Sequence, residues 1–352
     1  MTERGAFRDC RRRWYLDTVE RLAPRSQVAW ALHFGTIIHT GLEAYYRSGR
    51  VVTDMLDAFK AEWQEIDDTL ARDYGGMYTL GIEEEWWGYY LLGEGMLLNY
   101  DAYDRREGWF DEVIEVNIEE RGFVPIRDLR GRRLGGRPLL SGRIDLVVRK
   151  GDDFWVWDHK TAAQKPSYQA LDLDDQGTGY CYITWKSLGI IPRGFLYNVL
   201  LKRLPKEPVL LKSTGMLSTD KSRLMTYEKF MSAIKEHDHD PAWYSDHLEE
   251  LLNRGYDDFF KRDTSIRNLQ QLQQFEKRVY LEYRDMREVI RHPNLAYPNP
   301  NQRNCPSCAV LPICHAMEEN GNVEAMREMY VVQEPRHEIP EELRVEHAIS
   351  TN

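Results

Sequence analysis

The chain has 352 residues; 42% of them are apolar, enough for a buried core, and 30% are charged, which is ordinary for a water-exposed surface. This composition excludes collagen-like, coiled-coil and disordered chains, and no apolar run reaches the ~18 residues of a membrane span. The formal charge is −10, which by itself does not favour a nucleic-acid partner. The charged start, MTERGAFRDCRRRW, lacks the apolar segment of a signal peptide, so we expect a soluble, cytoplasmic protein without membrane contacts.

The first part of the chain is predicted to be helical. Helical patterns cover residues 5–22, 35–49 and 53–105. In the second of these, Ile38, Leu42 and Tyr45 recur at three- and four-residue spacing. The third is rich in Trp and Tyr, which we interpret as core packing rather than as a surface for stacking bases.

Strand patterns follow, and helices then return. Strands are expected over 109–126, in a hairpin over 141–160 and over 194–202, with a helix over 168–188. Helix dominates from 226 to 292. We therefore predict an α/β fold in one composite unit over 1–352: a helical part (1–110), a small mixed central sheet flanked by helices (111–205) and a helical C-terminal part with an acidic tail (206–352).

Charge is unevenly distributed along the chain. Residues 53–85 carry a net charge of −8 and residues 317–352 a net charge of −6, so the remainder is +4. Residues 121–143 hold seven arginines against one aspartate. A polyanion could therefore bind this basic segment, although an arginine-rich loop can also be merely solvated.

Three cysteines near the C-terminus, Cys305, Cys308 and Cys314, have the spacing C-x2-C-x5-C. In a chain without a secretion signal, clustered thiols favour a metal site over disulfides. A tetrahedral site needs a fourth ligand, for which Cys10, Cys181 and His315 are candidates. Cys181 lies in an apolar helical stretch and is expected to be a buried structural thiol. Spacing alone does not separate Zn²⁺ from an iron–sulfur cluster.

The hairpin expected over 141–160 carries the acidic residues Asp145 and Asp158. Its sequence, SGRIDLVVRKGDDFWVWDHK, has Gly151 and Asp152 at the turn. A two-residue or a four-residue loop gives the same register, which places Asp145 opposite Asp158. Opposed side chains in antiparallel strands have Cβ atoms about 5 Å apart. Lys160 lies two residues beyond Asp158, on the same face of its strand.

Two carboxylates about 5 Å apart repel each other by ~3 kcal/mol at an effective dielectric constant of about 20. A sheet tolerates this pairing if a cation bridges the two groups or if one of them stays protonated. Carboxylate oxygens suit Mg²⁺ or Mn²⁺, which can polarise a phosphodiester and activate a water molecule. The apolar residues of both strands argue against an edge hairpin whose charged side chains simply face solvent. We therefore predict a hydrolytic metal site here.

At these residues the chain resembles the RecB-like exonuclease branch of the PD-(D/E)XK nuclease superfamily, which includes the AddB nuclease domain and CRISPR-associated and phage exonucleases. Asp145 in GRID and Asp158-His159-Lys160 in DHKT resemble the two central motifs. GTIIH resembles an upstream helix motif whose histidine binds metal, which points to His39. QGTGY resembles the Q-x3-Y motif that follows the catalytic strand, at Gln176 and Tyr180. The resemblance implies a restriction-endonuclease-like core.

The resemblance also concerns the cysteines. One cysteine near the N-terminus and three near the C-terminus resemble the pattern of members that bind a [4Fe-4S] cluster, which implies that Cys10, Cys305, Cys308 and Cys314 are its ligands. Structural Zn²⁺ is the alternative. Only nine residues precede Cys10, fewer than is usual in the family. Some members add an acid from the strand before the hairpin, for which Glu115 and Glu119 are both candidates.

The predicted metal site and the family resemblance together imply a Mg²⁺- or Mn²⁺-dependent exonuclease that acts on single- or double-stranded DNA ends. The resemblance implies a role in DNA recombination, repair or processing in a bacterial or phage-infected cell, with a possible recombination partner protein. The alternatives are a structure-specific or restriction-type endonuclease and a non-catalytic subunit that binds DNA ends. Contacts to the DNA backbone are expected from five arginines: Arg11, Arg12, Arg13, Arg132 and Arg133.

Overall fold

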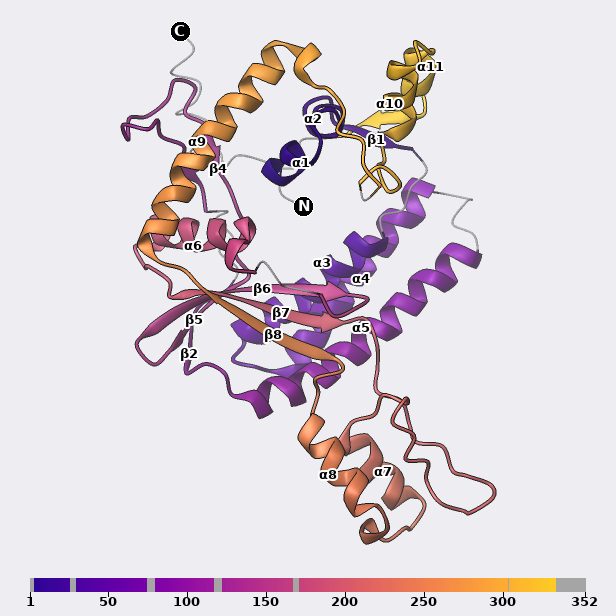
Figure 1. Cartoon of the computed structure of the whole chain (residues 1–352). Coiled ribbons are helices and arrows are strands. Elements are labelled where there is room, and N and C mark those ends of the chain that lie inside the picture. Colours follow the sequence, from indigo (N-terminus) through magenta and orange to yellow (C-terminus); the bar gives the residue numbers. More distant parts are fainter. Residues whose placement is uncertain are drawn as a thin grey trace. The chain divides into compact units, whose positions relative to one another are not determined.

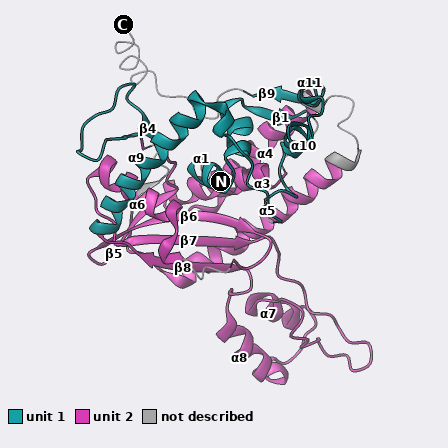
Figure 2. Ribbon diagram, turned by 45° about the horizontal axis from the view of Figure 1, so that its top comes forward, with its two compact units in different colours: residues 1–28, 123–141, 269–352 teal, residues 29–122, 142–268 magenta. Residues whose placement is uncertain are grey.

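The computed structural model describes residues 3–25, 30–74, 80–116, 122–166, 171–302 and 304–333 (Figure 1). Contacts divide the chain into two compact units, each built from separated segments (Figure 2). The first unit comprises residues 1–28, 123–141 and 269–352, and the second comprises residues 29–122 and 142–268. Within the described ranges, no helix has both the length and the apolar character needed to cross a membrane.

A five-stranded sheet forms the centre of the second unit, with the strand order β2-β5-β6-β7-β8. Its strands are β2 (Glu112–Val116), β5 (Leu146–Lys150), β6 (Asp153–Ala162), β7 (Gly194–Leu201) and β8 (Phe260–Ile266). The pair β6–β7 is parallel and the other pairs are antiparallel. The predicted α/β fold with a small mixed sheet flanked by helices is therefore confirmed.

The predicted hairpin is formed by β5 and β6, in the predicted register. Lys150 pairs with Asp153 at the turn, and Leu146 pairs with Trp157 at the far end. Val156 and Trp157 have no exposed surface, so the strand is covered on both faces, as its apolar sequence indicates.

Helices cover the two faces of this sheet. On one face lie α3 (Trp30–Arg47), α4 (Val52–Tyr74) and α5 (Leu80–Glu107), and Tyr46 of α3 packs against both Trp157 and His159 of β6. The short η3 (Leu171–Leu173) precedes α6 (Asp175–Leu188), which covers the other face. Figure 1 shows α6 and the α3–α5 helices around the sheet.

The expectation that helix dominates residues 226–292 is wrong at β8. This strand lies at the edge of the sheet and reads FKRDTSI, in which Phe260 and Ser265 are buried while most of the rest is polar. An edge strand of this kind lacks the apolar alternation by which strands are recognised. The segment between β7 and β8 carries α7 (Tyr227–Glu236), η4 (Pro241–Tyr244) and α8 (Ser245–Arg254), which share a small apolar core.

The first unit joins the two ends of the chain. Its elements are α1 (Glu3–Asp9), α2 (Arg11–Trp14), η1 (Tyr15–Val19), β1 (Leu22–Pro24), β3 (Val124–Pro125), β4 (Leu139–Leu140), α9 (Leu269–Arg291), η5 (Pro293–Leu295), α10 (Leu311–Glu318), α11 (Val323–Arg327) and β9 (Tyr330–Val332). Strand β1 pairs with β9, so that Leu22 lies opposite Val332. The helix expected over 5–22 is interrupted at Cys10, which has an extended backbone and caps α2.

Candidate functional site

Asp145 and Asp158 lie at one end of the β5–β6 hairpin, in the second unit. Asp145 directly precedes β5, and its Oδ2 accepts a hydrogen bond of 2.8 Å from the backbone N–H of His159. Asp158 is only 4% exposed. The two carboxylates are therefore placed by the strand register and by one main-chain hydrogen bond.

The ammonium group of Lys160 lies beside these acids. Its Nζ is 2.5 Å from Oδ2 of Asp158 and 5.3 Å from the ring centroid of Tyr197. Tyr197 is the neighbour of Asp158 on β7, and its hydroxyl donates a 2.7 Å hydrogen bond to Asp174 Oδ1. The sequence did not single out Tyr197, because the parallel register that brings it to Lys160 is set by a non-local crossover.

His39 reaches the same place from helix α3. Its Nδ1 is 3.2 Å from Oδ1 of Asp145, and the buried residues Ile37, Ile38 and Leu42 fix the helix that carries it. Burial acts to lower the pKa of His39, but the charge and hydrogen bond of Asp145 outweigh it, so the pKa lies above its ordinary value. The structure thus brings the His39 imidazole into contact with the Asp145 carboxylate, and the two form an ion pair when His39 is protonated.

The two carboxylates have opposite pKa shifts. Burial raises the pKa of Asp158, and the nearby charge of Asp145 raises it further, although Lys160 opposes both. Burial also acts to raise the pKa of Asp145, but the charge and hydrogen bond of His39 bring it below the ordinary value. Two acids whose surroundings shift their pKa values in opposite directions are typical of sites that bind a cation or transfer protons.

Helix α6 places Gln176 and Tyr180 near this cluster. Gln176 Nε2 donates a 2.8 Å hydrogen bond to the Tyr180 hydroxyl, one helical turn away. Burial raises the pKa of Tyr180, and the charge of Asp158 adds to the shift. Asp174 caps the helix by accepting a 2.6 Å hydrogen bond from the N–H of Gly177.

A buried polar network, which no local sequence pattern predicts, lies on the opposite face of β6. The ring of His159 stacks on Tyr46, and its Nδ1 is 2.8 Å from Nδ2 of Asn198. Asn198 also donates to Tyr100, and Arg262 of β8 contacts its Oδ1 at 3.3 Å. Burial lowers the pKa of His159 to about 3, so this ring is neutral.

Two arginines pair with one buried acid at the end of this network. Asp104 is fully buried and pairs with both Arg262 and Arg50. A buried charge is costly unless it is paired, so these groups must be present together. The network fixes the backbone of β6 at His159, whose N–H holds Asp145.

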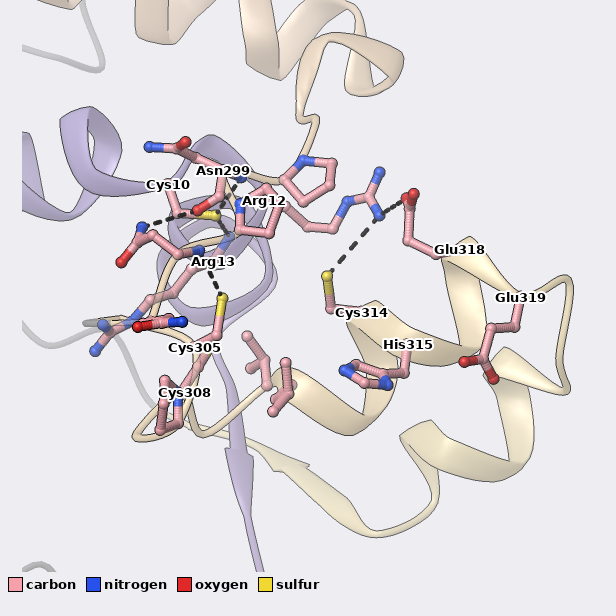
Figure 3. Close-up of a pocket in the computed structure, with 17 residues that line it drawn as sticks. Cys10, Arg12, Arg13, Asn299, Cys305, Cys308, Cys314, His315, Glu318 and Glu319 are labelled. Atoms are coloured by element: carbon pink, nitrogen blue, oxygen red, sulfur yellow. Dashed lines mark hydrogen bonds and ion pairs between the residues drawn. The ribbon is translucent and has the colours of Figure 1, made fainter.

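A pocket in the first unit contains the predicted cluster cysteines (Figure 3). Its volume is about 690 Å³, and Cys10, Cys305, Cys308, Cys314 and His315 all line it. The sulfur atoms of Cys10, Cys305 and Cys314 point toward the same hollow from α2, a loop and α10 (Figure 3).

Main-chain amides already donate to two of these sulfur atoms. The N–H groups of Arg13 and Asn299 lie 3.5 and 3.4 Å from Cys10 Sγ, and that of Asn301 lies 3.4 Å from Cys305 Sγ. Hydrogen bonds of this kind stabilise metal-bound thiolates.

The electrostatics of the pocket oppose free thiolates. Burial raises the pKa of Cys308 and of Cys314; Arg13 opposes the shift at Cys308 and Arg12 opposes it at Cys314, while the charge of Cys10 adds to it in both cases. A bound cation would relieve this repulsion, so the donor types fit a thiolate-bound metal.

The ligand candidates fit metal ions by chemistry but are not yet gathered around one. Among the described residues, no three His, Cys, Asp or Glu side chains are close enough together to hold a metal ion. In the second unit, the carboxylates are engaged by Lys160 and His39 instead. The oxygen donors of the two carboxylates nevertheless suit Mg²⁺ or Mn²⁺.

The remaining candidates are one cysteine, two glutamates and five arginines. Cys181 is fully buried in α6 of the second unit, as expected for a structural thiol. Glu115 pairs with Val147 in the sheet, but its side chain and the whole of Glu119 lie outside the described residues.

The five candidate arginines differ in their engagement. Arg11 lies over the rings of Phe7 and Tyr297, and Arg12 pairs with Glu318. Arg13 lines the cysteine pocket. Arg132 pairs with Asp128 at 2.8 Å, while Arg133 is exposed.

Comparison with known proteins gives one family. The model of the PD-(D/E)XK nuclease superfamily matches residues 2–315, a range that includes all the site residues described above. A search of curated proteins finds no match.

Proposed function

Because the chain belongs to the PD-(D/E)XK nuclease superfamily, which implies metal-dependent nuclease activity, we propose that it is an exonuclease that hydrolyses phosphodiester bonds from DNA ends. The observation that carries this proposal is the meeting of Asp145, Asp158 and Lys160 at one end of the β5–β6 hairpin. The RecB-like assignment rests on the additional matches at His39, Gln176 and Tyr180. The activity belongs to DNA recombination, repair or processing.

Asp145 and Asp158, with His39, would hold Mg²⁺ or Mn²⁺ in this proposal. When bound, such an ion polarises the phosphodiester and lowers the pKa of water. Lys160 orients the attacking water and stabilises developing negative charge, because its ammonium already lies against Asp158. Gln176 and Tyr180 bind the DNA strand near Lys160, where a phenol can stack on a base or donate a hydrogen bond.

We propose that Cys10, Cys305, Cys308 and Cys314 bind a [4Fe-4S] cluster. Their common pocket and the amides that point at Cys10 and Cys305 support this assignment. The cluster and the β1–β9 pair would together fasten the two ends of one composite nuclease spanning residues 1–352. Protein purified without oxygen should be brown and contain about four irons per chain. One zinc per chain and no iron would reject the cluster.

The nuclease assignment is tested with end-labelled linear DNA and Mn²⁺. Asp158→Ala and Lys160→Ala should each abolish degradation, because each removes one of the groups that meet at the hairpin end. Circular dichroism should show an unchanged fold. Normal cleavage by either purified variant would refute the assignment.

Closed circular DNA, present in the same assay, separates the possible activities. An exonuclease leaves the circle intact, whereas cutting of the circle would identify an endonuclease. If the wild-type protein binds DNA ends and degrades neither substrate, it is a non-catalytic subunit.

A further inference from the structure

Residues 123–141 form a hairpin within the first unit, and its tip has a defined conformation. Beyond the β3–β4 pair, Arg127 forms an isolated β-bridge with Arg133. Between them, Oδ1 of Asp128 accepts hydrogen bonds of 2.9 Å from the backbone N–H groups of Arg130 and Arg132. Its Oδ2 accepts a 2.8 Å bond from Nε of Arg132. One carboxylate thus holds three donors of the same loop.

Main-chain bonds add to this rigidity. The N–H of Gly131 donates to the carbonyl oxygen of Asp128 at 2.8 Å, and the N–H of Asp128 donates to that of Arg132 at 3.0 Å. Gly131 has a φ of 76°, which a residue with a side chain adopts only with strain. A tip fixed in this way loses little entropy when it binds a partner.

The tip presents one apolar and two cationic side chains. Leu129 is 56% exposed. Arg130 and Arg133 are exposed, and neither guanidinium has a partner among the described residues. Arg132, by contrast, is committed to Asp128. The sequence selected Arg132 and Arg133, whereas the structure leaves Arg130 and Arg133 available for a ligand.

An exposed apolar side chain on the same loop as two unpaired guanidinium groups matches the chemistry of a nucleic acid end. Guanidinium groups bind phosphates, and apolar side chains insert between bases that can be unstacked. Bases at a frayed or single-stranded end are the least costly to unstack, because they have fewer neighbours and no stable pairing.

We propose that residues 127–133 are a preformed docking tip for DNA ends with unpaired bases. Arg130 and Arg133 bind phosphates, and Leu129 packs against the face of a terminal base. Asp128 and Arg132 are positioning residues, because they hold the loop and not the ligand. This inference rests on the proposed nuclease function and names the class of DNA that the protein selects.

The phosphate contacts are tested by the salt dependence of binding. The full-length protein carries Lys160→Ala so that DNA is not degraded, and the probe is a fluorescein-labelled duplex with a single-stranded overhang. Adding Arg130→Ala and Arg133→Ala should weaken binding about 10-fold or more and reduce the slope of log K against log salt by about 2. The matched control is Arg291→Ala, which removes an exposed arginine already paired with Glu288 at 2.7 Å and should change neither quantity.

The contact to the base is tested with 2-aminopurine at the terminal position. Binding of the Lys160→Ala protein should raise its fluorescence as the base unstacks, and Leu129→Ala should remove most of that rise. Leu129→Met, which restores apolar bulk, should recover it. Equal fluorescence with leucine and with alanine would overturn the base contact.

The outcomes separate this inference from the function on which it rests. If the wild-type protein degrades linear DNA but the double arginine variant binds with unchanged affinity and salt slope, the docking tip is refuted and the nuclease stands. If the Lys160→Ala protein binds no DNA and the wild-type protein degrades none, both proposals fall.

Discussion

The carboxylate site of the second unit and the cysteine pocket of the first unit differ in what holds their groups in place. Asp145 and Asp158 are placed by the pairing of two adjacent strands, and their charges are balanced by His39 and Lys160. The cysteines converge from residues almost 300 positions apart and line an open pocket of about 690 Å³. No side-chain cation pairs with Cys10 or Cys305 among the described contacts; only main-chain amides reach them.

The fold alone therefore holds the groups of the carboxylate site in place, whereas the cysteine site would be completed by its ligand. Strand pairing and the contacts with His39 and Lys160 can hold the carboxylates without a metal. Burial and the charge of Cys10 disfavour ionised thiols at Cys308 and Cys314, and a bound cation would offset both effects. The variants below test whether the fold holds the carboxylate site and a bound ligand completes the cysteine site.

The largest effect is expected at the cysteine pocket. Cys305→Ala should reduce iron from about four atoms per chain to less than one, because a [4Fe-4S] cluster requires its four ligands. Cys181→Ala is the matched control, since Cys181 is buried in the other unit and does not line the pocket. Iron analysis measures both variants. Full iron content in the Cys305→Ala protein would remove this residue from the ligand set.

Removing one charge from the buried polar network behind β6 should lower the free energy of unfolding. Arg262→Met leaves the fully buried Asp104 with only Arg50 and should lower the free energy of unfolding by about 3–5 kcal/mol. Arg105→Met removes an exposed arginine that pairs with Asp101 at 2.7 Å and should cost less than about 1 kcal/mol. Denaturant unfolding followed by circular dichroism compares them. Equal costs would mean that the buried network does not support the sheet.

A smaller effect is expected where α6 meets the sheet. A Cβ at Gly177 would lie 2.5 Å from ring atoms of Phe195, which is itself buried, so Gly177→Ala should cost about 2 kcal/mol and reduce nuclease activity. Gly88 lies in α5 with no atom within 4 Å of such a Cβ, so Gly88→Ala should instead stabilise by about 1 kcal/mol. Thermal unfolding and cleavage assays give the two quantities. A tolerated Gly177→Ala would show that α6 is free to move away from β7.

The smallest effect concerns the cap of α6. Asp174→Ala removes the cap of the helix and the partner of Tyr197, at a cost of about 1 kcal/mol, and should slow cleavage because Tyr197 lies beneath Lys160. Thr226→Ala removes the cap of α7 at a similar cost, away from the site, and should leave cleavage unchanged. Comparable rates in the two variants, once stability is matched, would exclude a positioning role for Tyr197.

Local patterns predicted the fold class and the register of the hairpin, because strand periodicity and turn chemistry act over a few residues. They failed at β8, an edge strand with little apolar alternation, and at the interruption of the first helix at Cys10. Asp145, Asp158 and Lys160 were brought to one place by that same local register. Tyr197, Asn198 and Arg262 could not be found in this way, because their contacts depend on which distant strands become neighbours. The ligand roles of the cysteines remain predictions.

The pairing of β1 with β9 also orders events during synthesis of the protein. Leu22 cannot meet Val332 until the ribosome has made more than three hundred further residues. The strands and helices of the second unit, by contrast, are complete once residue 268 has emerged. The second unit can therefore fold first, whereas the N-terminal helices can pack only after their C-terminal partners have been synthesised. If the cysteine pocket binds a metal as proposed, its insertion would be one of the last steps in the maturation of the chain.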